Sequence, residues 1–324
     1  MGSVSPDAAP LLERRPSFDY ARAVCRVLQG YIEGTHMTVR TGIVGGGNMG
    51  GNMARRLLEC GAGVSVFDAS EAVRDALGKA GVPVATSLAA LAASVDLLIL
   101  SLPRADIVER VMGEVHVVLP DGSVVLDTST SEPATSQRLS TQASARGYTF
   151  IDGPVSGGPS AASTGSMTML LGGDMQALGR VISILDHLTA KRVVVGTSGA
   201  GHAAKIANNL LCAANLVLVA EAIKIGEAAG IPAASLLEGV NAGSGRSAVS
   251  EINYPRWILN ESFDSGFTMG LMRKDVRLAL TLAEQYGIAL PGFDCIARVW
   301  ESSAGTLSDS ADFNEIHRFE APDA

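Results

Sequence analysis

The sequence predicts an α/β protein, with a Rossmann-type parallel sheet followed by an all-α domain and a long interdomain helix joining them. Two observations support this. From Thr38 to about Gly196, short β-branched runs alternate with helical segments, which is typical of a parallel sheet with helices on both faces. From Ala200 onward strand signals almost vanish, and long helical segments follow.

The expected elements follow from the hydrophobic periodicity and from the Gly and Pro residues between runs. The expected strands are Val39–Val44, Val64–Phe67, Val82–Ala85, Val95–Leu100, Val124–Leu126, Thr149–Ile151 and Val193–Val195. The expected helices are Met49–Leu58, Glu71–Lys79, Ile107–Met112, Ala134–Ala145, Ala203–Ala229, Ala233–Val240 and Leu271–Tyr286. The expected domains are an N-terminal extension (1–37), a dinucleotide-binding domain (38–198) and an all-α substrate and oligomerisation domain (199–324).

Composition excludes several classes of protein. With 324 residues, 47% hydrophobic and 18% charged, the chain can bury a substantial core. A net charge of −8 argues against a nucleic-acid partner. The cysteines lack CxxC spacing, which favours reduced thiols in a cytoplasmic protein and argues against a metal site or a disulfide framework: Cys25, Cys60, Cys212 and Cys295.

The chain also contains one stretch of membrane-span length, 206–223. Several polar residues interrupt it, so a helix buried between two domains explains it better, and we expect no membrane role. The apolar C-terminal half would leave surface exposed in a single chain, which favours a homodimer or homotetramer. Residues 1–36 lack a secretory signal pattern and fit a transit peptide poorly, so we expect an extension there.

A GxGxxG motif follows the first expected strand and opens a helix. Gly45 permits a tight turn, Gly47 lets the backbone approach a pyrophosphate, and Gly50 allows close helix–strand packing. The helix N-terminus presents N–H groups to phosphates. We therefore expect Gly45, Gly47, Asn48, Met49 and Gly50 to bind a dinucleotide.

The second strand ends at Asp68, whose carboxylate can accept hydrogen bonds from a ribose diol and repel a 2′-phosphate. No Arg or Lys follows directly, and Arg74 lies several residues into the next helix. We therefore expect NAD in preference to NADP. The alternative is that Asp68 only caps the following helix.

Two more loops lie at the carboxyl ends of strands and should border the nicotinamide. Leu102-Pro103 follows the fourth strand, and a segment ending in Ser129-Thr130 follows the fifth. Ser129 and Thr130 could equally cap the helix after Pro133, and both roles could hold at once.

Two further segments carry reactive groups. The turn 153–158 is rich in N–H groups and holds one hydroxyl, Ser156, a combination suited to binding a carboxylate. Lys205 and Asn209 lie four positions apart, on one face of the long helix. Oxidation of an alcohol needs a base, and a lysine can serve if burial lowers its pKa. The ordinary alternatives are a Gly/Pro loop and a solvated lysine, but the apolar helix around Lys205 argues against the second.

These motifs resemble the β-hydroxyacid dehydrogenase family, which includes 3-hydroxyisobutyrate dehydrogenases and tartronate semialdehyde reductases. The resemblance runs from about Thr38 to Ala311 and rests on motifs in the family's order: Gly45–Gly50, Asp127–Thr130, Asp152–Gly158, 199–209, and Phe267 with Lys274-Asp275.

The resemblance implies Lys205 as the acid/base and Ser156, Gly157 and Gly158 as the carboxylate cradle. It implies Asn209 and Lys274 as substrate contacts. It places Thr130, Phe267 and Asp275 beside the cofactor, next to the Pro103 loop already expected there.

Departures from the family's pattern narrow the activity. A 6-phosphogluconate dehydrogenase would carry His-Asn where this chain has Asn208-Asn209, and imine reductases usually replace the lysine. Arg246 falls where relatives contact the distal part of a substrate, although a loop arginine is usually solvated. The expected function is NAD-dependent interconversion of a small β-hydroxy acid and its semialdehyde or keto form. Two alternatives stay open: a reductase of imines or larger aldehydes, and a non-catalytic binding module of the same fold.

Overall fold

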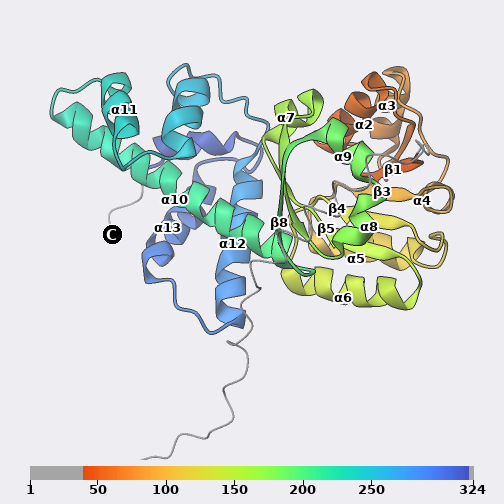
Figure 1. The fold of residues 1–324 in the computed structure, drawn as a ribbon. Coiled ribbons are helices and arrows are strands. Elements are labelled where there is room, and N and C mark those ends of the chain that lie inside the picture. The colour runs from red at the N-terminus through yellow and green to blue at the C-terminus, as the bar shows by residue number, and fades with distance from the viewer. Residues whose placement is uncertain (1–38, 321–324) are drawn as a thin grey trace, which may run out of the picture.

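The computed structural model describes residues 39–320 and divides into a sheet-containing part and a helical part. Helix α10 (Ala200–Ala228) leaves the sheet and runs diagonally across the helical part (Figure 1). This confirms the predicted α/β sheet, long helix and helical C-terminal region. The expected N-terminal extension lies outside the described residues.

The sheet has the strand order β2-β1-β3-β4-β5-β7-β6, with β8 paired to β7. The first five strands are parallel, β7 runs antiparallel to β5, and β8 runs parallel to β7. Their bounds are β1 Thr41–Val44, β2 Val64–Phe67, β3 Leu97–Leu100, β4 Val124–Asp127, β5 Thr149–Asp152, β6 Val155–Ser156, β7 Met167–Gly172 and β8 Thr189–Gly196.

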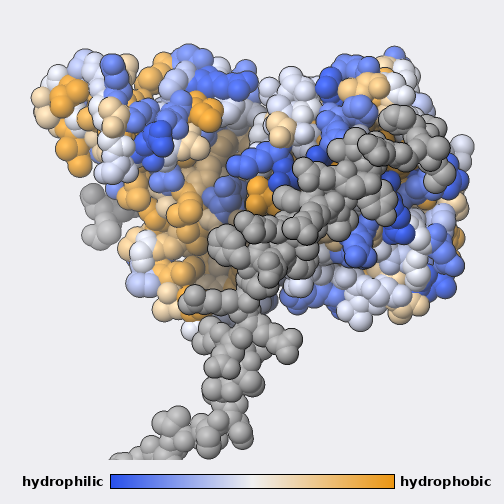
Figure 2. All heavy atoms as spheres, viewed as in Figure 1, coloured by the Kyte–Doolittle hydropathy of each residue, from blue (hydrophilic) through white to orange (hydrophobic). Residues whose placement is uncertain are grey.

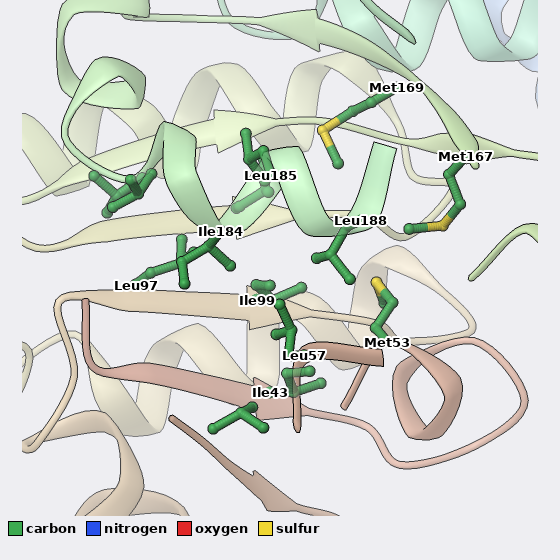
Figure 3. Packing of buried hydrophobic residues seen from close by; sticks show 14 of the residues in the cluster. Ile43, Met53, Leu57, Leu97, Ile99, Met167, Met169, Ile184, Leu185 and Leu188 are labelled. Atoms are coloured by element: carbon green, nitrogen blue, oxygen red, sulfur yellow. The ribbon is translucent and has the colours of Figure 1, made fainter. Parts of the chain in front are cut away.

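Successive side chains of the central strands enter two different cores, one on each face of the sheet. Leu97 and Ile99 of β3 join one cluster, whereas Leu98 and Leu100 join the other. This double burial explains why these strands appear in the sequence as unbroken apolar runs. Figure 3 shows the first cluster, where side chains of α2 and α9 pack against β1, β3 and β7.

Helices cover both faces. Those of the first cluster are α2 (Gly50–Glu59), α3 (Glu71–Lys79), α7 (Gly158–Thr164), α8 (Met175–Gly179) and α9 (Ile182–Leu188). Those of the second cluster are α4 (Leu88–Ala92), α5 (Ala105–Val115) and α6 (Pro133–Ala145).

Two details of the predicted sheet were wrong. The expected strand 82–85 reduces to one parallel bridge between Val66 and Val84, because Pro83 lacks the N–H that a longer ladder needs. The strand β7 was also not predicted from the sequence, so its antiparallel pairing with β5 was not expected. Its residues, Met-Thr-Met-Leu-Leu-Gly, are poor in β-branched side chains, so pairing and burial rather than propensity set this strand.

The helical part packs a separate core around α10. Trp300 lies at its centre, fully buried, and its indole N–H donates to the Ala213 carbonyl at 3.2 Å. The helices are α11 (Ala233–Ala242), a π-helix η1 (Val249–Ile258), α12 (Met269–Gln285), α13 (Pro291–Ser302), and the 3₁₀ turns η2 (Ser303–Gly305) and η3 (Phe313–Arg318).

By length and composition, α10 could cross a membrane. In the structure it contacts β7 and β8 of the sheet and α11, α12 and α13 of the helical part. Its outer face is nevertheless exposed at Leu211, Leu218 and Ile225, so the helix is buried on one side only. On the side of the molecule shown in Figure 2, apolar residues are more frequent over the helical part than over the sheet part.

Arg273 of α12 fastens the C-terminal segment to the helical core. Its side chain is 2% exposed and donates to the carbonyls of Trp300 and Leu307, to the Ser303 hydroxyl and to the Asp309 carboxylate. A buried guanidinium is tolerated there because its N–H groups are bonded.

We predict that Arg273→Leu lowers the free energy of unfolding by about 3 kcal/mol, because buried acceptors lose their donor. Arg277→Leu is the matched control: Arg277 lies one turn further along α12, is exposed, and within residues 39–320 pairs with Glu301 alone. Its cost should stay within about 1 kcal/mol. Urea denaturation of both variants measures this, and equal losses would contradict the structural role of Arg273.

Candidate active site

The glycine motif forms a tight loop between β1 and α2. Gly45 has a φ of +97°, which favours glycine, and a Cβ there would lie 2.2 Å from the Ser101 carbonyl oxygen. A Cβ at Gly50 would lie 1.9 Å from the Gly45 oxygen, so the helix can approach the strand only without a side chain. Both positions match the packing roles assigned from the sequence.

The outer side of this loop fits a nicotinamide dinucleotide. A Cβ at Gly47 would meet no atom within 4 Å, which leaves room for a phosphate against the backbone. Within residues 39–320, no acceptor bonds the N–H groups of Gly47, Asn48 or Met49. Unpaired N–H groups beside a helix N-terminus suit a pyrophosphate.

Asp68 at the end of β2 braces the glycine loop. Its carboxylate accepts from the N–H of Gly46 and from that of Ser70, each at 2.8 Å. Ser70, not Asp68, is the N-cap of α3, because its hydroxyl accepts from the Val73 N–H. The Arg74 side chain folds back and donates to the carbonyls of Asp68 and Ala69 at 2.7 and 3.1 Å. From the sequence, Arg74 was expected to lie too far along the next helix to contribute to the cofactor preference.

A cavity of about 660 Å³ lies between the sheet and the helical part, beyond the carboxyl ends of the parallel strands. The predicted residues that line it are Gly47, Asn48, Met49, Pro103, Thr130, Ser156, Gly157, Gly158, Lys205, Asn209, Phe267, Lys274 and Asp275. Gly45, Gly50 and Asp68 support the loop from outside the cavity. Arg246 does not line it, and its guanidinium lies 3.6 Å from the Glu251 carboxylate.

Lys205 reaches the turn after β5. Its amine is buried and donates to the Ser156 hydroxyl oxygen at 2.9 Å. Burial lowers the pKa of Lys205 from its usual 10.5, and repulsion from Lys274 adds to this, whereas attraction to Asp275 opposes it. A buried amine with a lowered pKa, in contact with a hydroxyl, can exchange protons with a bound alcohol.

Asp275 organises the helical side of the cavity. Its carboxylate accepts from the Asn209 amide at 2.5 Å and lies 3.1 Å from the Lys274 amine. Lys274 also donates to the Thr130 carbonyl at 3.1 Å. This amine therefore ties α12 to the loop after β4, so both parts of the chain hold the cavity wall.

Asp152 and Gly201 anchor the first turn of α10 to the sheet. The Asp152 carboxylate accepts from the N–H groups of Gly199 at 2.7 Å and His202 at 3.1 Å. A Cβ at Gly201 would lie 2.5 Å from the Leu170 carbonyl oxygen, so the helix packs directly on the β7 backbone. Because Lys205 lies one turn further on, this anchor sets the position of its side chain.

No motif in the sequence marks His202, which bridges two elements at the site. Its imidazole is fully buried and bonds the Ser129 carbonyl at 3.0 Å and the Ser136 hydroxyl at 2.7 Å. Burial lowers the pKa of His202 to about 4 and raises the pKa of Asp127, 3.8 Å away, to about 6. The imidazole is therefore neutral at pH 7 and bridges α10 to the loop after β4.

The contribution of η1 to the cavity was also missed. This helix lines the cavity with Asn253, Arg256 and Trp257. Pro255 lies within this helix, where a proline removes a backbone hydrogen bond and widens the local winding. Pro255 inside a helical stretch could have indicated an irregular helix here. No strand end or glycine motif marked these residues as part of a site.

Comparison with known proteins agrees with this geometry. A family model described as the NAD binding domain of 6-phosphogluconate dehydrogenase matches residues 40–196. Another, described as NAD-binding of NADP-dependent 3-hydroxyisobutyrate dehydrogenase, matches residues 199–319.

Individual relatives cover most of the chain. The 2-(hydroxymethyl)glutarate dehydrogenase of Eubacterium barkeri is 33% identical over 82% of this chain and 89% of its own length. The mitochondrial 3-hydroxyisobutyrate dehydrogenase of Drosophila melanogaster is 32% identical over 85% and 87%. The Mycobacterium tuberculosis 3-hydroxyisobutyrate dehydrogenase solved with L-serine matches with a TM-score of 0.82 at 28% identity, over 87% of this chain and 99% of its own.

The fold and these matches define a class, the NAD(P)-dependent dehydrogenases that act on a CH–OH group. Within that class, the chain belongs to the β-hydroxyacid dehydrogenase family, which includes the 3-hydroxyisobutyrate dehydrogenases. The predicted family is therefore confirmed, and the non-catalytic binding module is set aside.

Proposed function

We propose that this enzyme interconverts a small β-hydroxy acid, similar to 3-hydroxyisobutyrate, and its semialdehyde or keto form, with Lys205 as the general acid/base. The contact between the buried Lys205 amine and the Ser156 hydroxyl carries this proposal. It puts a titratable amine beside the turn expected to hold a carboxylate. The dinucleotide would lie along Gly47–Met49 and exchange hydride with the substrate carbon.

Each side chain has a distinct task in this proposal. Ser156 and the N–H groups of Gly157 and Gly158 hold the substrate carboxylate. Lys205, neutral in the oxidation direction, takes the hydroxyl proton and returns it in the reduction direction. Asn209, which Asp275 fixes through its amide, orients the substrate oxygen. Lys274 closes the site by its bond to Thr130.

We predict that Lys205→Ala lowers kcat/KM by roughly 100- to 10,000-fold and leaves dinucleotide binding intact, because only proton transfer is lost. In the parent enzyme, kcat/KM for oxidation should rise with pH and level off below pH 10.5, since the neutral amine is the active form. The Lys205→Ala variant should lose this rise of kcat/KM with pH. The assay uses short β-hydroxy acids, aldehydes and imines with NAD and NADP.

Lys224→Ala is the matched control, because Lys224 lies on the same helix, exposed and away from the cavity. Its turnover should equal that of the parent. A Lys205→Ala enzyme with full activity would reject the assigned role. Turnover of imines alone would replace the hydroxy-acid assignment by the imine reductase alternative.

For the cofactor, we propose NAD in preference to NADP. The Asp68 carboxylate lies at the end of β2, where it would accept from a ribose diol and repel a 2′-phosphate. Arg74 is close enough to attract a phosphate, but its guanidinium donates to backbone carbonyls and lies 5.7 Å from the centre of the Phe67 ring. In this proposal the Asp68 carboxylate, and not Arg74, therefore decides which cofactor is preferred.

We predict that Asp68→Ala weakens NAD and lowers the NAD/NADP ratio of kcat/KM by about tenfold or more, equivalent to about 1.4 kcal/mol. Asp68→Asn distinguishes the effect of the negative charge from the support of the glycine loop. It keeps an acceptor for the Gly46 N–H but removes the repulsion of a 2′-phosphate. Both variants should lower the ratio. If neither does, Asp68 serves only the glycine loop.

We also propose that residues 199–324 form the substrate and oligomerisation domain, with a second copy of this chain on the outer face of α10. Leu211, Leu218 and Ile225 recur every seven residues there and are 61%, 52% and 72% exposed. Such a stripe is self-complementary about a two-fold axis, which fits a homodimer or homotetramer.

We predict that the double variant Leu211→Asp/Leu218→Asp is smaller in solution than the parent, because burying these carboxylates would cost several kcal/mol. Light scattering after size-exclusion chromatography measures the mass. Ile288→Asp is the control, since Ile288 is 56% exposed but lies beyond α12. A monomeric parent would contradict the proposal.

The expected cytoplasmic location stays a prediction. The name of the Drosophila relative places that protein in mitochondria.

A further inference from the structure

The cavity contains more positive than negative charge, although the whole chain carries −8. Its charged lining residues are Lys205, Lys274 and Arg256 against the single carboxylate of Asp275. Lys274 is the cation that Asp275 neutralises, at 3.1 Å. Among the described residues, Lys205 and Arg256 are the lining cations without a carboxylate within 4.0 Å.

Arg256 differs from the other arginines of the helical part. Four of them lie within 4.0 Å of a carboxylate: Arg246, Arg273, Arg277 and Arg318. Among the described residues, Arg256 and Arg298 have no such partner, and of these two only Arg256 lines the cavity.

Arg256 is an exposed residue whose backbone is held by local contacts. It follows Pro255 in the π-helix, and its carbonyl accepts from the Asn260 amide and the Ser262 hydroxyl. Its guanidinium carbon lies 5.0 Å from the centre of the Trp257 ring, so the two side chains stack. Stacking restrains the plane of the guanidinium and leaves its N–H edge for an anion.

A substrate carboxylate held at Ser156 would lie beside the Lys205 amine, which donates to the Ser156 hydroxyl at 2.9 Å. It would leave Arg256, the other unpaired cation of the lining, without an anionic partner.

We propose that the substrate is a dianion, a β-hydroxy acid whose second carboxylate, distal to the hydroxyl, binds Arg256. This inference rests on the proposed function, because it assigns the far end of the same substrate. A second carboxylate would give Arg256 the anionic partner that it lacks among the described residues. The planar fork of a guanidinium matches a carboxylate with two parallel hydrogen bonds.

The test compares 2-(hydroxymethyl) diacids of increasing chain length with their distal monoamides, which have the same size and lack the second charge. The intact enzyme should prefer a diacid of suitable length over its amide by about tenfold or more in kcat/KM, as expected of a charge-assisted pair. The preference should lie mainly in KM.

Arg256→Gln should bring that ratio close to one, and Arg256→Lys should restore part of it, because the charge returns without the fork. Arg298→Gln is the matched control, an exposed arginine without a carboxylate partner away from the cavity, and should keep the parent ratio. If Arg246→Gln loses the preference for the diacid and Arg256→Gln keeps it, the second carboxylate binds Arg246 and the assignment to Arg256 is overturned.

The outcomes separate this inference from the proposed function. If the enzyme oxidises 3-hydroxyisobutyrate but treats diacids and amides alike, the function stands and the dianion is rejected. If it oxidises none of the hydroxy acids while it still binds the dinucleotide, the proposed function itself fails.

Discussion

The site depends on the buried Asp152 carboxylate at the end of β5, which fixes the first turn of α10. Two backbone N–H groups of that turn donate to it, so a helix that belongs to the helical part begins at a set position on the sheet. The same strand continues into the turn that carries Ser156, and one turn along the helix comes Lys205. Asp152 therefore fixes both the strand that leads to Ser156 and the helix that carries Lys205, and these two side chains lie 2.9 Å apart.

Burial of this junction has electrostatic consequences. Removing water lowers the pKa of Lys205 and of His202 and raises the pKa of Asp127, so uncharged forms are favoured where the two parts of the chain meet. A neutral imidazole can bridge the Ser129 carbonyl and the Ser136 hydroxyl without a charge that would need compensation. In the cavity, the Lys274 amine is paired with Asp275, whereas Arg256 has no carboxylate partner among the described residues.

Much of the fold could be predicted because it rests on local signals. Apolar runs located β1, β2, β3, β4 and β5 to within a few residues, and all but β3 end in Asp or directly before Gly or Asp. Local signals failed at the far side of the sheet. The residues of β7 form a strand because β5 and β8 pair with them, and Pro83 keeps 82–85 to a single bridge. The candidate site was predictable to the same extent: motif residues such as Ser156 and Lys274 line the cavity, whereas Arg246 does not.

By itself, the sequence determined the class of fold, the glycine loop after β1 and most of the predicted residues that line the cavity, because each depends on short spacings or on strand ends that share one sheet edge. Only the tertiary structure decided the contact of Lys205 with Ser156, the bridging role of His202, and the fact that Arg256, not Arg246, lines the cavity. Those features depend on how α10 and η1 pack against the sheet and against each other. Burial and charge compensation arise from that packing, between residues far apart in the chain.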